Sequence, residues 1–130
     1  MNVQNETIRV RRFQQEKPID RAGRPTTVTA VIENTGKDDV ELQPKLFLPP
    51  GVKRRSPGKD PAVSLASRAE TTVIWQIEAA EAGTYELLLK IDRGSEVVAT
   101  ASLSMPFLPA IGALEPQYIP EPQPVKTPIL

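Results

Sequence analysis

The chain has 130 residues, with 16 lysines and arginines, 16 aspartates and glutamates, and neither histidine nor cysteine. This length holds one domain of about 100 residues plus an appendage, and the balanced charge gives no general attraction for nucleic acid or an anionic membrane. Disulfides, the common zinc sites and catalytic sites built on His or Cys are excluded.

The sequence gives no sign of a membrane segment or a metal loop. No apolar run reaches the roughly 20 residues that cross a bilayer, and residues 2–12 lack the apolar core of a signal peptide. We therefore expect no membrane span, in a protein that is cytosolic or begins after a removed signal. The densest acidic cluster, Asp38, Asp39 and Glu41, lacks the spacing of a calcium loop, so we expect a solvated turn and no metal or cofactor.

Alternating apolar and polar residues predict seven β-strand segments. They lie at about residues 6–12, 26–33, 40–48, 62–65, 71–78, 85–91 and 97–105. Asn34-Thr35-Gly36 is expected to be a tight turn, because Asn and Gly tolerate positive φ. Pro44 has no N–H to donate, which predicts a sheet edge or a bulge. Residues 52–60 are expected to be a basic loop, and residues 92–95 a compact hairpin loop.

The last three segments carry the clearest core pattern. Their inward residues are expected to be Val73, Trp75 and Ile77, then Tyr85, Leu87, Leu89 and Ile91, then Val97, Ala99, Ala101, Leu103 and Met105. Strands of this length, separated by turns and without a helical period, predict an all-β antiparallel sandwich in preference to a barrel or an α/β fold.

The composition changes after Met105, where half of the 14 prolines lie. Pro116, Pro120, Pro122 and Pro124 favour an extended polyproline conformation, which is typical of a semi-rigid spacer. We therefore expect two parts: a β-sandwich at 1–107 and a Pro-rich linker or tail at 108–130.

Several motifs in this order resemble bacterial Ig-like accessory domains of the alpha-galactosidase-associated and CARDB types, the latter being cell-adhesion-related domains in bacteria. The motifs, over roughly residues 3–107, are Gly23, Val28-Ala30-Ile32, Asn34-Thr35-Gly36, Leu48-Pro49-Pro50-Gly51-Val52, Val73-Trp75-Ile77 and Ala82-Gly83-Thr84-Tyr85. The resemblance implies an Ig-like (fibronectin-III-like) sandwich of about seven strands that flanks catalytic or adhesive domains in secreted or periplasmic proteins.

Two details of the resemblance concern single positions. Gly83-Thr84-Tyr85 resembles the tyrosine that begins a late strand in many sandwiches, with its hydroxyl bonded to backbone upstream. Ser67-Arg68-Ala69 departs from the pattern, because such domains commonly place a glycine before the Trp-bearing strand.

The Pro-rich tail is similar to linkers that precede a (β/α)-barrel in exported glycan-processing enzymes. The resemblance thus implies a non-catalytic accessory or spacer module whose partner is a neighbouring catalytic domain in cis. Two alternatives are a carbohydrate- or protein-binding module that uses loops or an outer sheet face, and a stand-alone protein that assembles through a sheet edge.

A binding surface would need exposed aromatic or charged side chains. Trp75 and Tyr85 alternate with core residues and are expected to be buried, which leaves Phe13, Phe47 and Tyr118 as outward aromatics for sugar stacking. Phe47 is out of phase with its apolar neighbours. The possible interaction surface therefore consists of Phe47, Lys53, Arg54, Arg55 and Lys59.

Both basic segments also have a simpler interpretation. The residues around Lys53 and Lys59 suit a solvated loop tip, because no aromatic residue is interleaved for stacking. Arg9, Arg11 and Arg12 suit a solvated first strand, on which they would discourage edge-to-edge pairing between molecules.

Overall fold

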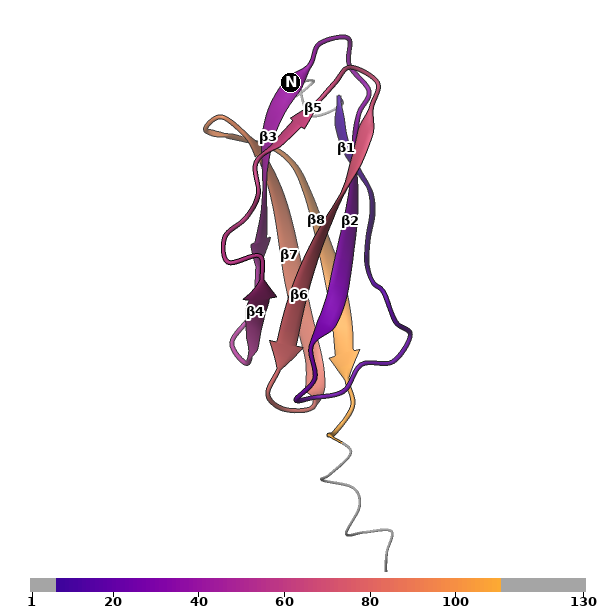
Figure 1. Ribbon diagram of the computed structural model, residues 1–130, viewed down its shortest axis with the longest axis vertical. Helices are drawn as coiled ribbons and strands as arrows, with labels where there is room; N and C mark the ends of the chain where they lie inside the picture. The colour runs from indigo at the N-terminus through magenta and orange to yellow at the C-terminus, as the bar shows by residue number, and fades with distance from the viewer. Residues whose placement is uncertain (1–6, 111–130) are drawn as a thin grey trace, which may run out of the picture.

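The computed structural model describes residues 7–110, which form two four-stranded antiparallel sheets and contain no helix (Figure 1). The first sheet has the order β1 (Ile8–Gln15), β2 (Thr26–Asn34), β6 (Glu70–Ala79), β4 (Val52–Ser56). The second has the order β5 (Val63–Leu65), β3 (Val40–Phe47), β7 (Gly83–Arg93), β8 (Glu96–Phe107). The predicted Ig-like sandwich is confirmed, and residues 111–130 of the predicted tail lie outside the described residues.

The structure has eight strands where the alternation marked seven segments, and the additional strand is β4. Residues 52–60 were expected to be a loop, but Val52 pairs with Ala79 and Arg54 pairs with Ile77. Arg54 therefore occupies an inward position on the strand. A charged residue at an inward position breaks the apolar alternation, which is why the pattern did not indicate a strand here.

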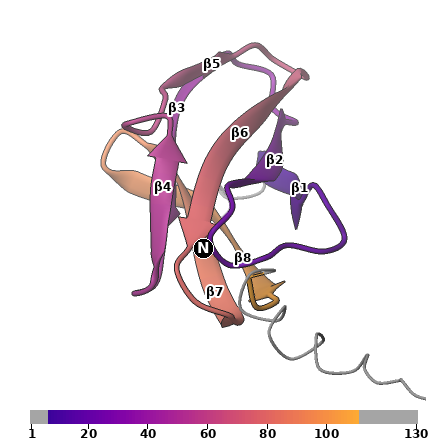
Figure 2. The same ribbon diagram turned by 60° about the horizontal axis from the view of Figure 1, so that its bottom comes forward.

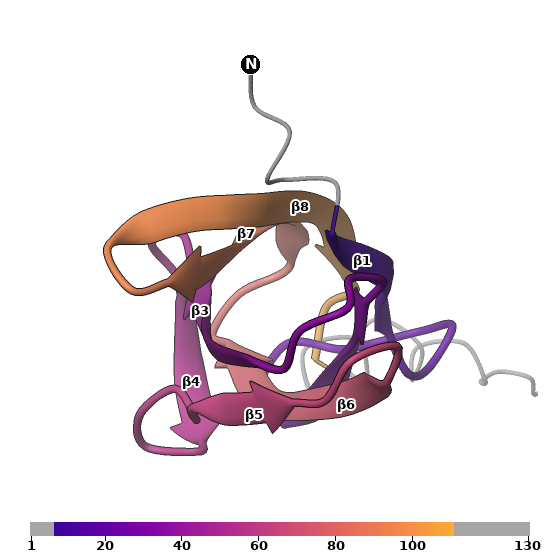
Figure 3. The ribbon, with the colours of Figure 1, turned by 90° about the horizontal axis from the view of Figure 1, so that it is seen from above.

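The two sheets face each other in the view from above (Figure 3), and residues of both form the hydrophobic core between them. Trp75 is fully buried in this core, which confirms its predicted place. The other fully buried side chains include Val28, Ala30, Ile32, Ile77, Leu87, Leu89, Ile91 and Met105. Burial of this apolar surface, at about 25 cal/mol per Å², is the main stabilising contribution available to a chain without disulfides.

The predicted phase of the last strand is wrong at its beginning and correct afterwards. Val97 is 44% exposed and Val98 only 2%, the reverse of the expectation. Between Ile91 and Asp92 the pairing partner moves from Ala99 to Val97. This β-bulge adds one residue to β8, and because side chains alternate with period two, one extra residue exchanges the two faces.

Pro44 lies at a sheet edge, as its missing N–H predicts. Residues 40–42 of β3 pair with β5, whereas residues 43–47 pair with β7. At Pro44 the side of β3 facing away from β7 therefore has no strand partner among the described residues.

Arg68 has a φ of 65°, the left-handed region that favours glycine, and its side chain is exposed. Arg68 lies within Ser67-Arg68-Ala69, the segment where the domains that this sequence resembles commonly place a glycine. We expect Arg68→Gly to raise the free energy of unfolding by up to about 1 kcal/mol in urea titrations, because left-handed backbone costs a residue with a Cβ roughly 1–2 kcal/mol, and glycine's greater entropy when unfolded offsets part of that gain. Arg68→Ala retains the strain and is the control. A glycine variant no more stable than the alanine variant would contradict this account.

Candidate interaction surface

The five residues predicted to form an interaction surface lie in different places. Phe47 projects from the outer face of the second sheet and is 47% exposed. Lys53 and Arg55 lie on β4 of the first sheet, where Arg55 Nη1 is 2.7 Å from Glu78 Oε1. Arg54 turns inward, and Lys59 lies in the loop after β4. The structure therefore does not bring the five into one continuous face, and their role in binding stays a prediction.

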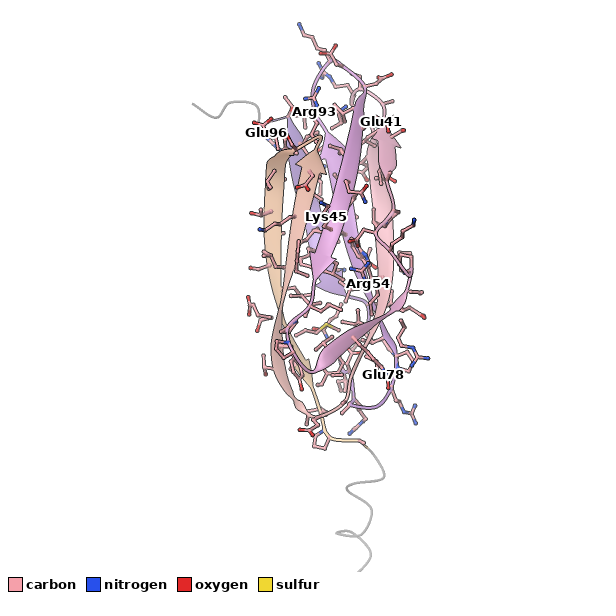
Figure 4. The ribbon with its side chains drawn as sticks, turned by 90° about the vertical axis from the view of Figure 1, so that its left-hand side faces the viewer. Glu41, Lys45, Arg54, Glu78, Arg93 and Glu96 are labelled. Carbon is pink, nitrogen blue, oxygen red and sulfur yellow. The ribbon has the colours of Figure 1, made fainter. Side chains whose placement is uncertain are left out.

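Phe47 has its own small apolar patch. Leu88 of β7 is its cross-strand neighbour, and the Lys90 ammonium lies 5.4 Å from the centre of the Phe47 ring, in cation–π geometry. Lys45, on the same outer face (Figure 4), makes a 2.9 Å ion pair with Asp92. On this outer face Phe47 is thus a single partly exposed ring, and its neighbours are Leu88 and the two lysines.

Arg54 belongs to a polar group that joins the two sheets, which we call the Asp60 cluster: Asp60, Arg54, Trp75, Leu46 and Gln43. Asp60 Oδ1 accepts from Trp75 Nε1 (3.1 Å) and from the Leu46 backbone N–H (3.4 Å), and it lies 2.8 Å from Arg54 Nη1. Arg54 Nη2 donates to the Leu46 carbonyl at 2.8 Å.

The cluster closes the side of the sandwich between β3 and β4 (Figure 4). Trp75 comes from the first sheet and Leu46 from the second, so a single carboxylate connects both. The Arg54 and Asp60 side chains are only 18% and 19% exposed. Gln43 Nε2 also donates to the carbonyls of Asp60 and Pro61. Arg54 therefore has a structural role in this cluster, and its predicted role in binding stays a prediction.

The remaining aromatic residues lie mostly in the core. Tyr85 is half-buried with its ring edge-to-face against Phe107, 5.8 Å between centroids. Its hydroxyl donates to the Glu81 carbonyl at 2.8 Å, four residues upstream, as the resemblance implies. Phe13 is half-buried against the core, and Tyr118 lies outside the described residues. Phe47 is thus the one largely exposed aromatic ring between residues 7 and 110.

The acidic residues near the second turn make hydrogen bonds within the protein. Glu41 accepts from the Ser64 hydroxyl, and Asp39 Oδ1 accepts from the Ser67 backbone N–H at 3.0 Å. Within the described part of the chain, no group of three or more acidic residues is placed to hold a metal ion. None of its elements is a helix that could span a bilayer.

The chain just beyond β8 is held by the loop between β1 and β2 (Figure 2). The Leu108 N–H donates to the Asp20 carbonyl and the Ala22 N–H donates to the Leu108 carbonyl, both at 2.8 Å. Arg21 Nη1 donates to the Pro109 carbonyl at 3.1 Å. We call these three contacts the exit clamp. They extend past the predicted domain boundary at 107/108, which stays a prediction.

Buried polar contacts fix the loop that forms the exit clamp. Asp20 is buried, and its carboxylate accepts from Gln15 Nε2 at 2.8 Å and from the Thr26 hydroxyl. Gln15 ends β1 and Thr26 begins β2. The Asp20 side chain therefore holds the loop to both of its flanking strands, while the Asp20 backbone carbonyl accepts from the Leu108 N–H.

No family model matches the chain, and no curated protein matches its sequence. In structure it is similar to native alpha-2-macroglobulin from Escherichia coli, with a TM-score of 0.63, 19% identity, and coverage of 80% of this chain and 7% of that one. It is also similar to the FixG-related protein from Vibrio parahaemolyticus (TM-score 0.57, 10% identity, 81% and 98% coverage) and to PapD-like domain 7 of human CEP192 (TM-score 0.56, 15% identity, 85% and 89% coverage).

These similarities establish the Ig-like sandwich fold. The chain spans only 7% of the macroglobulin chain, so it corresponds to one small part of that protein. At identities of 10–19% the shared feature is the arrangement of strands, and activity does not transfer with it.

Proposed function

We propose that this protein is a non-catalytic spacer module that orients a neighbouring domain of a larger exported bacterial protein acting on glycans. The observation that carries the proposal is the exit clamp, in which Leu108 and Pro109 are hydrogen-bonded to the β1–β2 loop. Because these contacts fix the direction in which the chain leaves the sandwich, they would also fix the starting orientation of whatever follows.

The positions where the first strand begins and the last strand ends support a spacer role. β1 begins at one end of the sandwich and β8 ends at the other (Figure 1). β8 has 12 residues, and at about 3.3 Å per residue it spans roughly 40 Å. A module connected at opposite ends adds its length between its neighbours, whereas one with adjacent ends would add little.

The comparisons support the modular part of the proposal. The fold occurs within the much longer alpha-2-macroglobulin chain and as domain 7 of CEP192. The more specific parts, a CARDB or alpha-galactosidase-associated type, a secreted or periplasmic location and a glycan-processing neighbour, rest on the sequence resemblance.

The test is the mass and location of the native polypeptide in its source cells, detected with an antibody against the sandwich. A mass far above 14.3 kDa in the secreted or periplasmic fraction supports the proposal. A mass near 14.3 kDa overturns the spacer role. A large polypeptide confined to the cytosol keeps the spacer role and overturns export.

A second candidate is a binding module centred on Phe47, which the exposed ring favours. We expect Phe47→Ala to change the free energy of unfolding by less than about 1 kcal/mol, because the ring is half exposed on an outer face. It should nevertheless abolish any affinity for a polysaccharide panel measured by calorimetry. Ile74→Ala is the control, since Ile74 is exposed on the other sheet. Absence of binding by the unmodified protein at millimolar sugar would rule out this candidate for glycans.

A further inference from the structure

The exit clamp joins two segments that are far apart in the chain. Arg21 and Leu108 form an isolated parallel β-bridge, in which the Leu108 N–H donates to the Asp20 carbonyl and the Ala22 N–H donates to the Leu108 carbonyl. The bridge therefore closes residues 23–107 into a loop, and this loop contains all the strands from β2 to β8.

Tension between Thr7 and Ala110 cannot extend this loop while the bridge holds. With the bridge intact, the shortest connection between the two residues runs from Thr7 to Arg21, across the bridge, and from Leu108 to Ala110. The strands from β2 to β8 lie outside that connection. The bridge must therefore break before a pull on these two residues can draw those strands out.

The parallel direction of the bridge lets its hydrogen bonds resist such a pull together. The two segments run the same way, so a pull toward the N-terminus at Arg21 and toward the C-terminus at Leu108 acts in opposite directions along them. Hydrogen bonds between strands lie across the strand direction, so this pull loads both backbone bonds at once. In an antiparallel bridge the two ends would leave on the same side and be peeled apart one bond at a time.

The β1–β2 loop that carries one half of the bridge is itself fixed to the first sheet. The Gly23 N–H donates to the carbonyl of Ala79, the last residue of β6, at 2.8 Å. The Asp20 carboxylate accepts from the side chains of Gln15 in β1 and Thr26 in β2. The loop therefore cannot move with the departing chain unless contacts to three strands are also lost.

We propose that the exit clamp makes the sandwich resistant to tension applied between residues 7 and 110. β1 begins at one end of the sandwich and β8 ends at the other, so this tension acts along the long axis (Figure 1). The proposed spacer role supplies the source of the tension, and the inference rests on it in that respect. The resistance itself belongs to the sandwich, so its failure would leave the spacer role standing.

The experiment pulls single molecules through cysteine handles, which attach at unique positions because the chain has no cysteine. The pair Thr7→Cys and Ala110→Cys loads the exit clamp. The pair Thr7→Cys and Lys37→Cys peels β1 from β2 instead, starting at the hydrogen bond between the Thr35 N–H and the Thr7 carbonyl. At equal force we expect unfolding to be at least about tenfold slower between 7 and 110, because two backbone hydrogen bonds must break together.

The variant Leu108→Pro removes the N–H that donates to Asp20, and Leu108→Ala retains this N–H and is the matched control. Leu108 is 41% exposed, so neither variant loses much packing. Between 7 and 110 we expect the proline variant to unfold about fivefold faster than the alanine variant, the effect of one hydrogen bond. Between 7 and 37 the two variants should unfold at the same rate. Urea titration checks that both are folded.

A second variant, Arg21→Ala, tests the clamp without introducing a proline. It removes the side-chain hydrogen bond to the Pro109 carbonyl, and we expect unfolding between 7 and 110 to become about two- to fivefold faster, with no change between 7 and 37. Equal rates for folded Leu108→Pro and Leu108→Ala between 7 and 110 would overturn the proposal. So would variants that unfold faster by the same factor in both pulling directions, because that result indicates a general loss of stability.

Discussion

Replacing Asp60 with alanine is expected to lower the free energy of unfolding by about 3 kcal/mol. The substitution leaves three donors without their acceptor: the Trp75 indole N–H, the Leu46 backbone N–H and the Arg54 guanidinium. Trp75 is fully buried and Arg54 mostly so, so water cannot readily replace the lost carboxylate. Urea titration followed by tryptophan fluorescence measures the loss, since the chain contains a single tryptophan.

Two further variants identify the origin of that loss. Asp60→Asn retains an oxygen acceptor for Trp75 but removes the charge beside Arg54, so we expect about half the effect. Asp92→Ala removes the acid of the Lys45 ion pair on an outer face, where Lys45 is 44% exposed, and should cost less than about 1 kcal/mol. Equal losses for Asp60→Ala and Asp92→Ala would show that the cluster contributes no more than an ordinary surface pair.

Asn34→Ala is expected to cost about 3 kcal/mol as well. The Asn34 side chain is 1% exposed. Its Nδ2 donates to the carbonyls of Asp38, Leu65 and Ala66 at 2.8–3.3 Å, while its Oδ1 accepts from the Gly36 N–H at 2.9 Å. One amide thus holds the turn after β2 against the segment after β5. Thermal or urea unfolding of the variant measures this contribution.

The controls for Asn34 separate its donors from its acceptor. Asn34→Asp keeps an oxygen for Gly36 but turns a carboxylate toward carbonyl oxygens, so its loss should exceed that of Asn34→Ala. Lys37→Ala, in the same turn and exposed, should change stability by less than about 0.5 kcal/mol. If Asn34→Asp were as stable as the unmodified protein, the hydrogen bonds to the three carbonyls would not be the source of the effect.

The roles of Asn34 and Asp60 could not be predicted equally well from the sequence. Asn34 stands in an Asn-Thr-Gly tripeptide between two apolar runs, and this pattern indicates a turn by local chemistry alone. Its contacts with the carbonyls of Leu65 and Ala66 span more than 30 residues, so no local pattern reports them. The role of Asp60 is harder still to predict. An acidic residue at the end of a basic segment suits a solvated loop as well as it suits a buried cluster.

The sequence by itself determined seven of the eight strands between residues 7 and 110, most of the core and the absence of chemistry based on His or Cys. Side chains on a strand alternate between faces, so apolar residues at every second position specify a half-buried strand before any partner is known. This suffices for Trp75, Leu87 and Leu89, which lie in the core as predicted. It also places Phe47 outside, because its position is one residue out of phase with the inward residues of β3.

The tertiary structure alone decided the features that depend on distant partners. Arg54 is inward because Asp60 neutralises it, and Val98 replaces Val97 in the core because a bulge shifts the pairing with β7. The exit clamp unites Asp20 and Leu108, which are far apart in the chain. In each case the free energy comes from contacts between segments that fold together, whereas sequence periodicity records only which face of its own strand a residue occupies.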